Sequence, residues 1–113
     1  MNIDLHWTEL YRNEIQQAEN AKAAGNQGMS RVCARRAAGI IVSEYFSRQG
    51  IEFESPSVYE RLAYLISLPS TNPQIKETAA HFLIRVTPDF ELPIQADLIS
   101  EANWLKNQLL NED

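Results

Sequence analysis

The sequence is poor in the residues that build disulfides and metal sites, with one cysteine and two histidines in 113 residues. A single cysteine, Cys33, cannot form an intramolecular disulfide. Because it falls within an apolar helical pattern, we expect it to be a small buried hydrophobe in a reducing compartment. One cysteine and two distant histidines make no metal site unless carboxylates supply most of the ligands. We therefore expect neither a metal nor a cofactor.

Signatures of covalent and phosphoryl chemistry are also missing. The sequence contains no G-x-S-x-G, no glycine-rich phosphate loop and no suggestively paired carboxylates. We therefore favour a non-enzymatic protein over an enzyme and assign no catalytic residue.

Long apolar runs and an excess of positive charge are absent too. The segment "MNIDLHWTEL" has neither the basic nor the apolar region of a secretory signal, and "AAGII" is far too short for a membrane span. Ten Lys and Arg against 15 Asp and Glu give a net charge of −5, which disfavours general nucleic-acid binding but allows one local basic pocket. We expect a cytoplasmic protein that makes no membrane contact.

The sequence does show helical periodicity in five stretches. Its length predicts one domain, residues 1–113. N-cap residues, closing glycines and prolines predict helices at about 4–24, 30–49, 57–68, 72–87 and 94–110. The short stretch "IEFE" alternates too briefly for a strand, and we expect an irregular link there. Since short connections join antiparallel neighbours, the predicted fold is an all-α, up-and-down bundle of four main helices and one short helix.

Three arginines lie near the start of the helix expected at 30–49, in "SRVCARRAAGIIVSEYF". Apolar residues cover more than half of this helix, which predicts a central position in the bundle. Arg31 and Arg35 lie in line with the core, whereas Arg36 lies on the polar side. Cations in the first turns oppose the helix dipole, so negative charge is expected nearby.

Two sources of that negative charge remain open. One is an internal carboxylate on the first or last helix, from the set Glu14, Glu19, Asp97 and Glu101. The other is an external phosphate, which a helix N-terminus and two arginines bind well. In that case Arg31 and Arg35 contact the phosphate oxygens. Three further residues are weaker candidates for binding the phosphate: Arg36, His81 and Arg85.

His81 and Arg85 lie one turn apart at the edge of the apolar face of the fourth expected helix. Such a histidine is either a hydrogen-bonded boundary residue or part of a pair that cleaves a phosphodiester, and the second role needs another acid or base nearby. His6, near the start of the first helix, is given no role.

The last expected helix carries more apolar surface than one stripe accounts for. Four apolar residues fall outside the stripe: Ile94, Ile99, Trp104 and Leu110. Such a face either belongs to the core or is covered by a second copy. We predict a homodimer through helices that include Trp104.

The order of these features resembles the HEPN domains, small helical nucleotide-binding domains that are often encoded beside minimal nucleotidyltransferases. The resemblance covers nearly the whole chain. It is carried by five segments: "AENAKAAGN", "ARRAAGIIVSEYFSRQG", "YERLAYLI", "LIRVTPD" and "ISEANWLKNQLL". It implies a four-helix bundle with an extra short helix, usually dimeric, and a nucleotide or a nucleotidyltransferase as partner.

The chain departs from the nuclease members of that family. They resemble one another in an arginine followed four to six residues later by histidine, and no arginine here has a histidine in that window. RNA cleavage of that type is therefore disfavoured. The likeness to "LIRVTPD" points to Arg85, with Val86 in place of the family's aromatic residue.

Three hypotheses follow. The first is a non-enzymatic, HEPN-like bundle that binds a nucleotide or another phosphate ligand, or assists a nucleotidyltransferase. The second is an interaction or scaffold bundle without a small ligand. The third is an unorthodox ribonuclease that uses His81 and Arg85.

Overall fold

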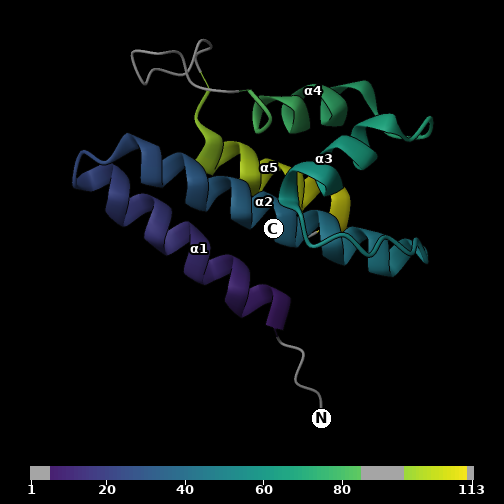
Figure 1. Ribbon diagram of the computed structural model, residues 1–113, viewed down its shortest axis with the longest axis horizontal. Coiled ribbons are helices and arrows are strands. Elements are labelled where there is room, and N and C mark those ends of the chain that lie inside the picture. Colours follow the sequence, from purple (N-terminus) through teal and green to yellow (C-terminus); the bar gives the residue numbers. More distant parts are fainter. Residues whose placement is uncertain (1–5, 85–95, 112–113) are drawn as a thin grey trace.

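The computed structural model describes residues 6–84 and 96–111, and within these ranges the chain is all-helical (Figure 1). The helices are α1 (His6–Ala23), α2 (Gln27–Gln49), α3 (Val58–Ser67), α4 (Pro73–His81) and α5 (Leu98–Leu110). No strand occurs in the described ranges, and "IEFE" lies in an irregular link between α2 and α3. The predicted all-α helical class is confirmed. Two of the helices are short, since α3 has 10 residues and α4 has 9.

The longest helix, α2, is the centre of the bundle, as predicted from the apolar residues that cover more than half of its surface. It packs against α1, α3 and α5, and α4 packs against α3 and α5. Figure 1 shows α1 and α2 as an antiparallel hairpin whose tight turn lies at one end of the molecule. The largest fully buried side chains come from α2, α3, α5 and the end of α4: Phe82, Ile41, Leu62, Leu65, Leu105, Val42 and Cys33.

Most of the predicted caps are in place. The Ser57 hydroxyl accepts the Glu60 N–H at the start of α3, and the Asn72 side chain accepts the Gln74 N–H at the start of α4, where Pro73 is the first helical residue. Gly50 ends α2 with a φ of 70°, a left-handed conformation that costs glycine little.

Three helix boundaries differ from the predictions, and at two of them another side chain caps the start of the helix. The Asn26 side chain accepts the Met29 N–H, so α2 begins at Gln27 rather than near Ser30. The Asp97 carboxylate accepts the Ser100 N–H, so α5 begins at Leu98 rather than near residue 94.

The third difference is at α4, which ends at His81 instead of continuing toward Pro88. The N–H groups of Phe82 and Leu83 bond three residues back, to the carbonyls of Ala79 and Ala80, so the chain tightens into a turn there. Val86, the last member of the predicted apolar stripe, lies outside the described residues.

Among the described residues, none of the helices combines the length and apolar character that crossing a membrane requires.

Candidate functional site

Arg35 is bound inside the protein. Its Nε donates to the Phe82 carbonyl over 2.9 Å, and its guanidinium carbon lies 4.9 Å from the centre of the Tyr59 ring. Phe82 follows the last turn of α4, where unpaired carbonyls carry partial negative charge that a cation stabilises. The negative partner expected for this arginine is therefore a helix C-terminus and an aromatic ring rather than one of the four carboxylates.

Arg31 and Arg36 flank Arg35 in different environments. Because α2 begins at Gln27, Arg31 lies in the second turn, and it is half-buried. Arg36 is exposed, on the polar side as predicted. Arg36 therefore lies apart from Arg31 and Arg35, which are both half-buried and share one side of α2.

Cys33 is fully buried, as expected. Burial raises the pKa of its thiol, and the nearby Glu14 carboxylate raises it further, while Arg36 acts in the opposite direction. A buried thiol with a raised pKa is a weak nucleophile. Cys33 is therefore a structural residue of the hydrophobic core.

His81 and Glu101 join α4 to α5. The His81 Nδ1 lies 2.8 Å from Glu101 Oε1, and each side chain is 24% exposed. This pairing is the hydrogen bond expected of a boundary residue, and Glu101 is also the second acid or base that the phosphodiester role requires, so both roles of His81 stay predictions. Arg85, its predicted neighbour, lies outside the described residues, and so does the side chain of His6.

Sequence reasoning missed Arg48, which repeats the role of Arg35 at another helix. Its Nη1 donates to the Leu110 carbonyl at the end of α5 over 3.2 Å, and its Nε pairs with Glu44 over 2.9 Å. The guanidinium also lies 5.8 Å from the centre of the Trp7 ring. Only the Glu44 pair, four residues away on one helix, had a signal in the sequence.

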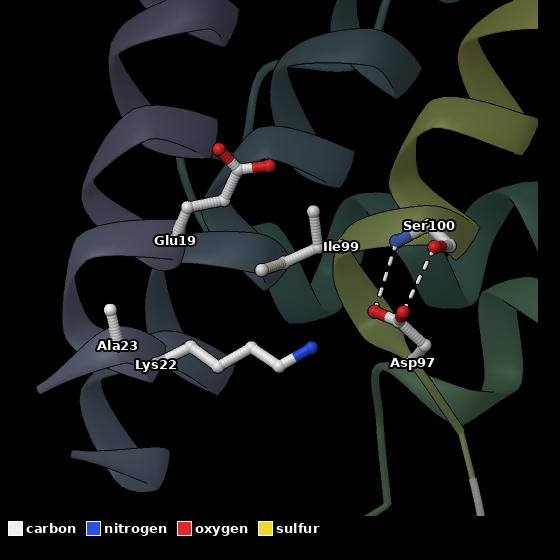
Figure 2. A pocket seen from close by; sticks show the side chains of 6 residues that line it. All are labelled: Glu19, Lys22, Ala23, Asp97, Ile99 and Ser100. Carbon is white, nitrogen blue, oxygen red and sulfur yellow. Dashed lines mark hydrogen bonds between the residues drawn. The ribbon is translucent and has the colours of Figure 1, made fainter. Parts of the chain in front are cut away.

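An open depression of about 470 Å³ lies between the end of α1 and the start of α5 (Figure 2). Its lining residues are Glu19, Lys22, Ala23, Asp97, Ile99 and Ser100. Figure 2 shows Lys22 extending from α1 toward Asp97, and Asp97 bound to the backbone and hydroxyl of Ser100.

The charges of this depression do not suit a phosphate. Burial raises the pKa of Asp97, but the hydrogen bonds from Ser100 and the charge of Lys22 outweigh it, so the pKa lies below its usual range. Asp97 is therefore an anion at neutral pH. With Glu19, the depression has two carboxylates against one ammonium, and it repels a multiply charged anion.

No group of three or more metal-ligating side chains lies together in the part of the chain that the structure describes.

Four large hydrophobic side chains of the described residues are exposed: Leu10 of α1, Met29 of α2, and Tyr59 and Tyr64 of α3. The outward residues of α3 are Tyr59, Glu60, Ala63, Tyr64 and Ser67, which we call the α3 face. Tyr59 is 44% exposed and Tyr64 is 37% exposed. Both rings are held in place, Tyr59 beneath Arg35 and Tyr64 stacked on Phe53 at 4.8 Å.

The apolar surface predicted on the last helix lies largely within the fold. Leu110 is buried, and Ile99 and Trp104 are half-buried and pack against the core. Ile94 lies outside the described residues. A homodimer through Trp104 stays a prediction.

Comparison of the chain with protein-family models, with curated proteins and with solved structures finds no match.

Proposed function

We propose that this protein is a non-enzymatic interaction module that binds a protein partner through the α3 face. The observation that carries the proposal is the pair of exposed tyrosines, Tyr59 and Tyr64, whose rings are already fixed by internal contacts. Tyrosine is enriched at interfaces because its ring supplies a large contact area and its hydroxyl a hydrogen bond. A ring that is already ordered loses little further entropy on binding.

The composition of the α3 face also favours a protein partner. Ala63, exposed between the two tyrosines, is small enough for another chain to approach closely. Leu62 and Leu65, which lie away from this face, are fully buried, so α3 is anchored while its outer side remains exposed.

The rival hypothesis, a nucleotide site at Arg31 and Arg35, has less support. The Arg35 guanidinium already has an acceptor and an aromatic ring. His81, one of the weaker candidates for phosphate binding, is paired with Glu101. The resemblance to HEPN domains remains part of the proposal, and it makes a nucleotidyltransferase the first protein partner to test.

Photo-crosslinking in cells tests the proposal. Benzoylphenylalanine replaces Tyr64 in one variant and Leu10 in the other, because Leu10 is a 54% exposed apolar residue on a different helix, α1. We expect a discrete crosslinked partner from position 64 and none from position 10. Ala63→Gln, which adds bulk to the centre of the α3 face, should abolish the crosslink. Crosslinking from position 10 alone, from neither position, or unaffected by Ala63→Gln contradicts the proposal.

A further inference from the structure

The aromatic rings behind the α3 face form a supported platform. Phe53, from the link after α2, stacks on Tyr64 with an interplanar angle of 21°. Phe46, buried in α2, meets both rings edge-on, at 5.7 Å from Phe53 and 5.6 Å from Tyr64. A stacked pair backed by a core ring presents a rigid aromatic surface beside solvent.

Three exposed glutamates lie close to this platform along the chain. In the link, half-buried Phe53 stands between Glu52 and Glu54, which are both exposed. Glu60 is exposed one helical turn before Tyr64 on the same side of α3. The nearest cation in the sequence, Arg61, is half-buried at the edge of the face. Arg35, which lies over Tyr59 on the same face, is also half-buried, so the exposed charges beside the platform are the carboxylates.

Aromatic rings and carboxylates together favour one kind of ligand. A guanidinium or ammonium group is attracted to the face of an aromatic ring and also pairs with carboxylates. A nucleic acid or another acidic surface would be repelled by the same glutamates. Charge complementarity thus selects a basic occupant.

We infer that the partner presents a basic segment, whose arginine or lysine side chains lie against Tyr64 and Phe53 and pair with Glu52, Glu54 and Glu60. This inference rests on the proposed function, since it names the partner class for the same face. Rim charges of this kind act mainly on the rate of association and on the choice of partner, and salt weakens them.

A direct binding measurement tests the inference with a defined probe, a fluorescein-labelled peptide in which arginine alternates with alanine. We expect saturable binding in fluorescence anisotropy that weakens as sodium chloride is added. The triple variant Glu52→Gln/Glu54→Gln/Glu60→Gln should weaken binding by about tenfold, since each exposed ion pair contributes modestly. A peptide with glutamate in place of arginine should not bind.

A matched variant separates a local site from general attraction to an acidic protein. Glu9→Gln/Glu19→Gln/Glu77→Gln removes three exposed glutamates from α1 and α4, away from the α3 face. It should leave the affinity within about twofold of the wild type. Equal weakening by both triple variants, or none by the first, overturns the inference.

The crosslinking experiment distinguishes this failure from failure of the proposed function. If position 64 captures its partner equally well in the Glu52→Gln/Glu54→Gln/Glu60→Gln background, the α3 face binds a partner that is not basic. The proposed function then stands and the inference falls. If no partner is crosslinked from position 64, both the proposed function and the inference are contradicted.

Discussion

At the residue scale, two arginines of α2 bind the carboxyl ends of two other helices. Arg35 donates to the carbonyl after α4, and Arg48 donates to the last carbonyl of α5. Each guanidinium also lies near an aromatic ring, Tyr59 for Arg35 and Trp7 for Arg48. A buried carbonyl without a partner costs free energy, and a cation there also meets the negative end of a helix dipole. The cations of this central helix therefore stabilise its neighbours.

This role predicts unequal effects for the two adjacent arginines. Arg35→Gln should lower the free energy of unfolding by about 1–3 kcal/mol, because the Phe82 carbonyl loses a charged donor and Tyr59 loses its cation. Arg36→Gln, at an exposed position, should change it by less than about 0.5 kcal/mol. Urea denaturation followed by circular dichroism measures both variants.

Arg35→Lys provides a second control for the same site. Lysine keeps the charge but lacks the planar fork of donors, so it should recover only part of the lost stability. Equal stability of the Arg35→Gln and Arg36→Gln variants would show that the bond to Phe82 contributes nothing.

At the scale of helices, local chemistry in the sequence predicts much of the pattern. Ser57, Asn72 and Gly50 mark their boundaries because each acts on backbone groups within a few residues. The end of α4 had no such signal in the sequence: after His81 the chain tightens into a turn, in which the N–H groups of Phe82 and Leu83 bond three residues back. Two other local caps were not recognised from the sequence: Asn26, which starts α2, and Asp97, which starts α5.

One close approach between helices also had no signal in the sequence. Gly39, buried in the middle of α2, faces Val58 at the start of α3. A Cβ at position 39 would lie 2.9 Å from one methyl carbon of Val58 and 3.0 Å from the other. Side chains do not tolerate such a distance, so the glycine allows α3 to pack directly on α2.

We expect Gly39→Ala to destabilise the protein by about 1–3 kcal/mol, because overpacking outweighs the better helix propensity of alanine. Gly28→Ala is the matched control within α2, since its nearest neighbour would be 3.9 Å away. It should be neutral or stabilising by up to about 1 kcal/mol. Thermal unfolding of both variants gives the comparison.

The double variant Gly39→Ala/Val58→Ala identifies the cause. It should be more stable than the sum of the two single effects predicts, because the smaller side chain makes room for the new methyl group. If the effects of the two single substitutions simply add, the loss of stability in Gly39→Ala does not come from the contact with Val58.

At the scale of the whole molecule, the sequence predicts the bundle and its central helix but not which side chains meet. Arg31, Arg35 and Arg36 are adjacent in the chain, yet Arg35 turns to the end of α4 while Arg36 stays exposed. Phe53 and Tyr64 come together only because the link folds back along α3. The α3 face was therefore not among the sites predicted from sequence.

The packing of α5 gives a prediction about association. Trp104 is half-buried against the core. Trp104→Glu should therefore lower the thermal midpoint and leave the sedimentation coefficient of the folded protein unchanged, since it places a charge against the core. Gln108→Glu, at an exposed position one turn further along α5, is the control. A shift from dimer to monomer without loss of stability would instead support the predicted dimer through Trp104.

A thermal-shift panel of nucleoside mono-, di- and triphosphates, with and without magnesium, tests the central claim most directly. A ligand at a hundred times its dissociation constant adds about 2.7 kcal/mol to the stability of the folded state. For a domain of this size, that moves the midpoint by on the order of 10 °C. If the bundle serves a protein partner, as we propose, no nucleotide produces such a shift. A nucleotide-induced shift that disappears in Arg31→Ala/Arg35→Ala would contradict the proposed function and show that these two arginines bind phosphate.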